Sequence, residues 1–122
     1  MKAVHFICRR DESGSLRNLR FDRNSHLYHS GKWDITEEAA AALVGGWLYL
    51  HPRKADASEF GGTVEGFKLV RDDTAARTLR IELLVRKQPQ GTGQPWRGQA
   101  HGMAWTSGLV SAGFAHETAG GR

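Results

Sequence analysis

The sequence has a single cysteine, Cys8, and only three prolines. One cysteine excludes an intramolecular disulfide, so we expect a reducing cytoplasm. Cys8 stands in the first apolar run, where we predict a small buried side chain rather than a reactive thiol. No run approaches the ~18 consecutive apolar residues of a membrane span. The start, MKAVHFICRRDE, does not have the pattern of a signal peptide. We therefore expect no membrane partner.

Familiar catalytic and cofactor motifs are also missing. The segment 108–113 has one residue too many for the nucleophile elbow of a hydrolase. The GTG at 91–93 runs into Pro95 and opens no helix, so it does not predict a dinucleotide loop. His26 and His29 form an HxxH pair, but a chain with one cysteine and no carboxylate cluster nearby is a poor match to a zinc site. We predict neither a metal nor a cofactor.

The remaining composition is that of one globular domain with a basic balance. A chain of 122 residues has the length of a single domain, and its apolar share of 39% is ordinary for a globular protein. The formal charge of +4 favours an anionic partner. The Lys and Arg residues are scattered rather than gathered in one run. We predict a single globular domain over residues 1–115 and a C-terminal tail at 116–122.

Short strand patterns dominate the chain. In 78–87, alternation predicts that Leu79, Ile81, Leu83 and Val85 face inward. In 47–51, alternation places Leu48 and Leu50 on one face and Trp47, Tyr49 and His51 on the other. Gly66 suggests a bulge or a close approach of backbones. The composition of 88–99 predicts a loop, and the last Gly/Ser-rich part, 101–114, could carry one more short strand. The other strand patterns are at 2–8, 16–22, 26–35, 47–51 and 62–70.

One short helix is predicted at residues 35–44. Thr36 has the residue type of an N-cap, and Gly45 has that of the residue that ends a helix. Such a short helix depends on packing, so we expect Leu43 and Val44 to enter the core. Many short strands and one short helix predict a mainly β (α+β) fold, as a small barrel or a strongly bent sheet.

The middle of the chain resembles a known family. A short helix, a glycine, the strand WLYLH, a loop with a lysine and the strand TVEGF follow one another as in PUA-like domains, including the ASCH and EVE groups. The resemblance covers residues 43–66. It implies a small PUA-like pseudo-barrel that binds RNA or holds a modified base in an aromatic-lined pocket, and a few ASCH-like members are amidohydrolases acting on modified nucleosides. The matching residues are Leu43, Gly45, Gly46, Leu48, Tyr49, His51, Lys54, Ser58, Gly61, Gly62, Val64, Glu65 and Gly66.

The loop after Pro52 is the predicted ligand site. Pro52 removes a backbone donor and ends the strand, so Arg53 and Lys54 project from a loop. Trp96 lies in a Gly/Pro/Gln-rich loop beside Arg97, and this pair suits a base and a phosphate. We hypothesise a non-catalytic binding module for nucleic acid or a nucleotide-like ligand. The predicted ligand-binding residues are His51, Arg53, Lys54, Ser58, Trp96, Arg97, His101 and Trp33. Glu65 is also predicted to form a hydrogen bond with the edge of a base.

Each of these residues also has an ordinary structural interpretation. Arg53 and Lys54 can be a solvated pair, and large aromatic side chains fill the core of a small barrel. Two other functions therefore stay open. One is a small amidohydrolase that uses Lys54, Glu65 and His51. The other is a protein-interaction domain whose tryptophans are buried.

Overall fold

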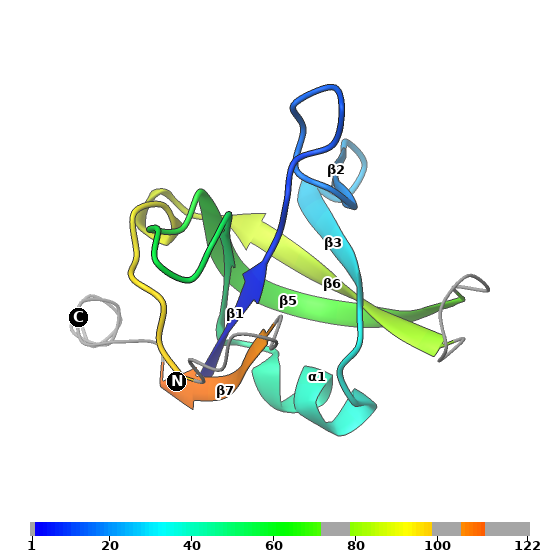
Figure 1. Cartoon of the computed structure of the whole chain (residues 1–122). Helices are drawn as coiled ribbons and strands as arrows, with labels where there is room; N and C mark the ends of the chain where they lie inside the picture. The colour runs from blue at the N-terminus through cyan, green and yellow to red at the C-terminus, as the bar shows by residue number, and fades with distance from the viewer. Residues whose placement is uncertain (1, 72–78, 99–105, 112–122) are drawn as a thin grey trace.

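The computed structural model describes residues 2–71, 79–98 and 106–111 (Figure 1). Over these residues the chain is mainly β, with one mixed sheet and one α-helix, which confirms the predicted mainly β (α+β) class. The predictions for His101 and for the tail at 116–122 concern residues outside the described ranges. The described part has no helix long and apolar enough to cross a membrane.

The elements follow the predicted order with shifted ends. The helix α1 spans Glu37–Leu43, and a short 3-10 turn, η1, spans Pro89–Gly91. The strands in chain order are β1 (Lys2–Ile7), β2 (Leu19–Asp22), β3 (Leu27–Trp33), β4 (Trp47–His51), β5 (Phe60–Arg71), β6 (Leu79–Lys87) and β7 (Thr106–Ser111).

The sheet has the order β2-β3-β6-β5-β4-β1-β7. Strands β1 and β4 are parallel, and the other pairs are antiparallel. The sheet is strongly curved, and α1 lies below it (Figure 1). β1 is therefore an inner strand, between β4 and β7, although it is the first element of the chain.

Local chemistry sets the ends of α1. The Thr36 hydroxyl accepts a hydrogen bond from the Ala39 amide at 3.1 Å, so the predicted N-cap is confirmed. Gly45 has a φ of +87°, the left-handed conformation that glycine adopts readily after the last helical turn. Leu43 is fully buried, but Val44 is 46% exposed, so the prediction for Val44 was wrong. The chain has already left the helix at Val44, which points its side chain away from the core.

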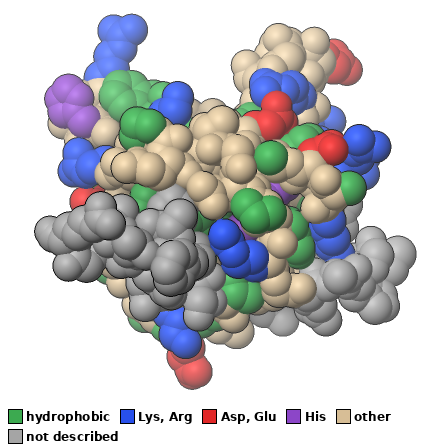
Figure 2. All heavy atoms as spheres, turned by 90° about the vertical axis from the view of Figure 1, so that its left-hand side faces the viewer, with side chains coloured by type: hydrophobic (Ala, Val, Ile, Leu, Met, Phe, Trp, Pro, Cys, Tyr) green, Lys and Arg blue, Asp and Glu red, His purple; other side chains and the backbone are tan. Residues whose placement is uncertain are grey.

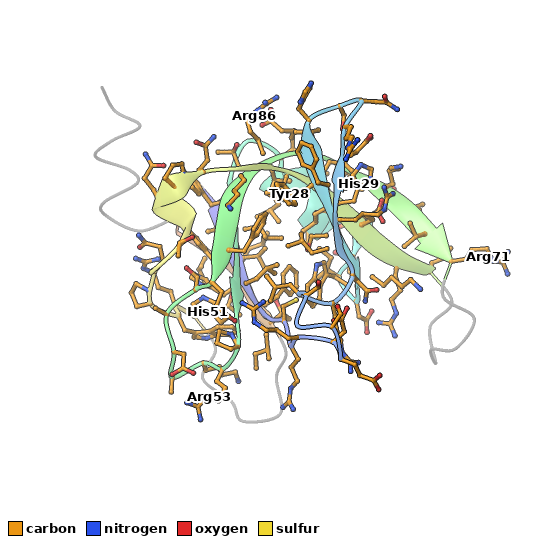
Figure 3. All side chains as sticks on the ribbon, turned by 90° about the horizontal axis from the view of Figure 1, so that it is seen from above. Tyr28, His29, His51, Arg53, Arg71 and Arg86 are labelled. Atoms are coloured by element: carbon orange, nitrogen blue, oxygen red, sulfur yellow. The ribbon has the colours of Figure 1, made fainter. Side chains whose placement is uncertain are left out.

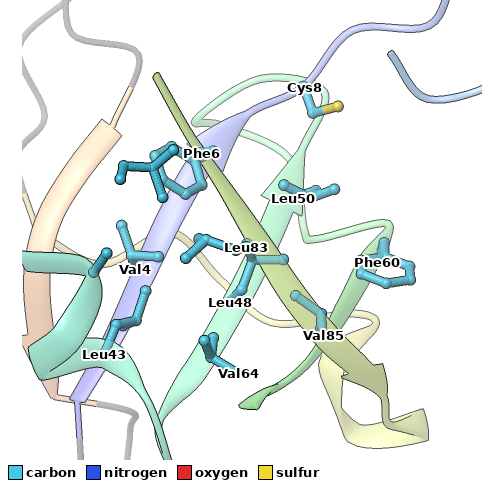
Figure 4. Packing of buried hydrophobic residues seen from close by; sticks show 12 residues of the cluster. Val4, Phe6, Cys8, Leu43, Leu48, Leu50, Phe60, Val64, Leu83 and Val85 are labelled. Carbon is cyan, nitrogen blue, oxygen red and sulfur yellow. The ribbon is translucent and has the colours of Figure 1, made fainter. Parts of the chain in front are cut away.

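The core fills the concave side of the sheet, against α1. Alternation along β4 and β6 places their aliphatic side chains there, as predicted (Figure 4). Leu79 is 53% exposed, so the inward prediction fails at this residue. It is the first residue of β6, where the strand runs beyond the core. The cluster comprises Val4, Phe6, Cys8, Ala40, Leu43, Leu48, Leu50, Phe60, Val64, Ile81, Leu83 and Val85.

Glycines shape β5 at two points, with a bulge beside Gly66 and a close approach at Gly61. The pairing of β5 with β6 shifts register between Val64 and Gly66, which confirms the predicted bulge. Earlier in β5, a Cβ atom on Gly61 would lie 2.6 Å from the Cα atom of Gly91. β5 and the 3-10 turn η1 therefore pack backbone against backbone at this point.

Candidate functional site

The convex face of β1 and β4 is buried as completely as the core face. Register pairs His5 with Tyr49 and Ile7 with His51, so side chains from the two strands lie side by side. His5, Tyr49 and His51 are all fully buried. Two parallel inner strands are commonly covered on both faces, but two histidines in such a position are unusual because a buried polar group needs a partner.

The two histidines are hydrogen-bonded to each other. His5 Nδ1 lies 2.7 Å from His51 Nε2, and His51 Nδ1 lies 2.9 Å from the backbone oxygen of Asp56. A carbonyl oxygen only accepts, so we assign the proton of His51 to Nδ1. His51 Nε2 then carries a lone pair, and His5 Nδ1–H donates to it. This arrangement leaves His5 Nε2 as a bare acceptor.

His5 Nε2 is buried and has no hydrogen-bond partner among the described residues. Burial, the neighbouring His51 and the Arg97 charge together lower the pKa of His5 to about 3, with burial as the largest cause. Burial also lowers the pKa of His51, although its bond to Asp56 works in the opposite direction. Both rings are therefore neutral near pH 7. The site presents a fixed acceptor that matches an N–H donor of a ligand.

Trp96 lies against the histidine pair. The centroid of its ring is 5.5 Å from that of His5 and 5.1 Å from that of His51. The Lys54 ammonium lies over the indole, 5.6 Å from the ring centroid. Tyr49 stacks on the His5 ring at 4.7 Å. The structure thus brings together three of the predicted residues, His51, Lys54 and Trp96, in one aromatic cluster.

The loop that carries Trp96 is held by Ser58. The Ser58 hydroxyl donates to the backbone oxygen of Gly91 and accepts from the backbone amide of Gln94. Backbone bonds from Ser58 N to Gln94 O and from Gly93 N to Ser58 O add to this connection. Ser58 is 3% exposed. Its hydroxyl therefore positions the 92–98 loop rather than facing a ligand.

The predicted phosphate-binding residues lie at the edge of the same cluster. Arg53 is exposed and forms an ion pair with Asp56 at 2.8 Å. His51 and Arg53 project from the same end of the sheet (Figure 3). Arg97 is half-buried, and its charge lowers the pKa of His5, His51 and Tyr49, so it lies within electrostatic reach of all three. Its guanidinium contacts the Gln94 side-chain oxygen at 3.4 Å.

Glu65 and Trp33 lie elsewhere. Glu65 forms an ion pair with Arg86 at 3.4 Å. Arg86 and His51 lie apart in Figure 3 and belong to strands β6 and β4, which are separated by β5. Trp33 stacks on Phe6 in the core-facing layer, with ring centroids 3.9 Å apart. The geometry of the described residues therefore does not assemble Lys54, Glu65 and His51 into one catalytic centre.

Sequence reasoning missed His5 as a site residue. Its neighbours in β1 are apolar, so the pattern indicated only a buried strand. The pairing of β1 with β4 is parallel and distant in sequence, and no local pattern reports it. An irregularity in the pairing of β1 with β7 also falls at His5, whose amide donates to the Ser107 hydroxyl at 2.9 Å. Irregular strand positions of this kind are frequent beside functional sites.

The described residues contain no group of three or more His, Cys, Asp or Glu side chains that could hold a metal ion. His29 of the HxxH pair instead contacts Glu82, with Nδ1 and Oε1 2.8 Å apart. Comparisons of the chain with protein-family models, with curated proteins and with solved structures found no match. The likeness to PUA-like domains stays a prediction, and the site has to be interpreted from its own chemistry.

Proposed function

We propose that the protein is a binding module for a nucleotide-like ligand, either as a free nucleotide or within a short single strand. The observation that carries the proposal is the buried, unpartnered Nε2 atom of His5 beside Trp96. A heterocyclic base offers both an N–H donor for a neutral imidazole and a flat face for an indole.

Base recognition uses His5 and Trp96 together. His51 and the Asp56 carbonyl fix the ring orientation of His5, so its acceptor is held in place before the ligand arrives. Both imidazoles are covered, and Trp96 is the half-buried side chain against them. A base therefore reaches His5 when the Trp96 side chain turns outward, and it then stacks on the indole. Stacking of this kind contributes about 1–3 kcal/mol per base.

The cations of the cluster suit the phosphate of the same ligand. Lys54 already lies over Trp96, Arg53 directly precedes Lys54 in the chain, and Arg97 directly follows Trp96. On this side of the molecule, Lys and Arg side chains are spread among acidic ones rather than gathered in a continuous stripe (Figure 2). A dispersed charge of this kind supports a ligand of one or a few nucleotides rather than a long duplex.

The test is a titration of the full chain with mononucleotides and with short single-stranded RNA and DNA, followed by NMR of the tryptophan indole N–H groups. We expect a saturable shift of the Trp96 signal and affinity that falls as salt rises. Trp96→Ala should lower the affinity at least tenfold. His5→Phe, which keeps a ring but removes the acceptor, should also lower it.

The control is Phe21→Leu, because Phe21 is an exposed aromatic side chain in β2, away from the cluster of His5, His51 and Trp96. This variant should bind as the parent does. The proposal is wrong if no nucleotide or strand binds at low ionic strength, or if Trp96→Ala binds as tightly as the parent.

A further inference from the structure

A cavity lies at the carboxyl end of β1, and its lining includes none of His5, His51 and Trp96. It has a volume of about 170 Å³. We propose that this cavity is a binding site for a small phosphate monoester, and this inference does not rest on the proposed function. The cavity is lined by Ile7, Cys8, Arg9, Arg17, Asn18, Gly31, Lys32 and Trp33.

Charge is the first argument. Three cations, Arg9, Arg17 and Lys32, line the cavity, and its lining has no acidic residue. Among the described residues, neither the Arg17 guanidinium nor the Lys32 ammonium has a hydrogen-bonding or ion-pair partner, whereas Arg10, for example, binds Glu59 at 2.7 Å. A phosphate monoester carries about −1.5 to −2 charges near pH 7. It therefore matches the two positive charges of Arg17 and Lys32 better than a singly charged carboxylate does.

The acidic groups beside the cavity have hydrogen-bond or ion-pair partners of their own, although the Arg17 charge reaches Asp11 and helps its hydrogen bonds to lower the pKa of that carboxyl. Asp11 and Glu82 line a neighbouring hollow that shares Asn18, Gly31 and Lys32 with the cavity. The Asp11 carboxylate accepts hydrogen bonds from Ser13 and Ser15, and Glu82 contacts His29. Neither carboxylate neutralises Arg17 or Lys32 through an ion pair in the part of the chain that the structure describes.

The backbone at Lys32 is the second argument. The pairing of β3 with β6 shifts register between Gly31 and Trp33, so Lys32 is the extra residue of a β-bulge. Its φ is +21°, a conformation that is costly for a lysine. The bulge breaks the alternation of side chains, and Gly31, Lys32 and Trp33 all line the same cavity. The strained bulge thus allows Lys32 to line the cavity beside Trp33.

The walls of the cavity are held together by backbone hydrogen bonds. Arg17 N donates to Arg9 O at 3.0 Å, and Gly31 N donates to Asn18 O at 3.1 Å. Asn18 also has a left-handed backbone, with a φ of +56°. Three segments that are separate in the sequence are therefore fixed around the cavity before a ligand binds. Such preorganisation lowers the entropic cost of binding.

Trp33 and Cys8 define the apolar part of the cavity. One face of the indole is covered by Phe6, and its N–H donates to the Ser30 hydroxyl at 3.0 Å. Cys8 is 3% exposed, and its thiol contacts Arg17 O at 3.5 Å. The volume of about 170 Å³ is below the ~300–1,000 Å³ of sites for drug-sized ligands. The ligand is therefore a phosphate with a small apolar or planar group that packs against Trp33.

Phenyl phosphate is a suitable probe, and amide NMR of the full chain is a suitable measurement. We expect saturable shifts at Asn18, Gly31 and Lys32 at millimolar phenyl phosphate. Benzoate should bind at least tenfold more weakly, and neutral benzyl alcohol should cause no saturable shift. Arg17→Gln and Lys32→Gln should each lower the affinity about tenfold, because each removes a charge-assisted hydrogen bond.

Arg23→Gln is the matched control, because it removes one exposed positive charge from outside the cavity lining. This variant should bind as the parent does. Lys32→Gly is a second variant, which relieves the positive φ while removing the ammonium, so it should fold at least as stably as the parent and still lose affinity. The inference is overturned if phenyl phosphate causes no saturable shift, if benzoate binds equally well, or if Arg23→Gln loses as much affinity as Arg17→Gln.

Discussion

His5 and His51 are 46 residues apart in the sequence, and their imidazoles share a hydrogen bond of 2.7 Å between adjacent parallel strands. This bond links β1 to β4, and a second hydrogen bond links His51 to the Asp56 carbonyl oxygen. A buried pair of neutral histidines has measurable consequences, because each ring gains a proton in the unfolded chain at a higher pH than in the folded one.

Stability should fall as the solution is acidified below neutral pH. The pKa of His5 is lowered from 6.5 to about 3, and that of His51 is also lowered. Between pH 3 and pH 6.5 the unfolded state binds more protons than the folded state does. The stability that the neutral histidines contribute is therefore fully present above pH 6.5 and is lost as the pH falls toward 3. Urea unfolding from pH 8 to pH 4.5 should show a slope of up to about 1.4 kcal/mol per pH unit for each histidine.

His5→Phe should flatten this slope, whereas His26→Phe should leave it unchanged because His26 is exposed. A parent protein with the same free energy of unfolding throughout this range would contradict the burial of the pair as neutral rings.

The salt dependence of nucleotide-strand binding should report the contact made by Lys54. If its ammonium meets a phosphate, Lys54→Gln lowers the slope of log affinity against log salt by about 0.7 for a single strand. Lys87→Gln is the control, since Lys87 is an exposed lysine at the end of β6. Equal slopes for Lys54→Gln and the parent would show that the Lys54 ammonium does not contact a phosphate.

Gly61→Ala should separate η1 from β5. The new Cβ atom would lie 2.6 Å from the Gly91 Cα atom, and backbone cannot move aside as a flexible side chain can. We expect a loss of about 1–3 kcal/mol in the free energy of unfolding. The Trp96 indole signal should shift, because η1 leads into the loop that carries it.

Gly66→Ala is the matched control in the same strand. Its Cβ atom would make only an ordinary contact, 3.6 Å from Leu84 Cδ1. It should cost less than Gly61→Ala and leave the Trp96 signal in place. The reverse order of the two effects would contradict the packing of η1 on β5.

Thr36→Ala should remove the N-cap of α1. The Thr36 hydroxyl accepts from Ala39 N, and no helical partner replaces it. We expect a loss of about 1 kcal/mol in thermal or urea unfolding. Thr36→Ser keeps the acceptor and should retain most of the stability.

Leu83→Ala should be among the costly core substitutions. Leu83 is fully buried, and truncation of a buried leucine costs about 2–5 kcal/mol. Leu69→Ala, in the neighbouring strand β5, removes the same atoms from a side chain that is 50% exposed. Urea unfolding should therefore separate the two variants by more than about 1 kcal/mol.

Local chemistry made much of the fold predictable. Three features depend only on residues close together in the sequence, and each has the predicted structure. They are the alternation in β4 and β6, the N-cap at Thr36 and the helix end at Gly45. The failures at Val44 and Leu79 fall on the ends of elements, where a pattern does not tell how far the core extends.

The candidate site was predictable only in part. Lys54 and Trp96 stood out because loops that carry a cation and an aromatic residue are typical of binding sites. Ser58 was selected for the same loop, but its hydroxyl bonds to backbone groups of the 91–94 segment. His5 depends on the pairing of strands distant in sequence, and the bulge at Lys32 depends on its register with β6. Such non-local relationships are not encoded in short patterns.

The position of β1 inside the sheet also bears on how the chain folds. β1 is synthesised first, but its neighbours are β4 and β7, and Ala3 pairs with both Trp47 and Val110. Contacts between distant residues raise the contact order and slow folding. While β7 is still missing, one edge of β1 stays unpaired and able to associate with another chain. Folding during synthesis should therefore finish late, only after residues 106–111 have left the ribosome.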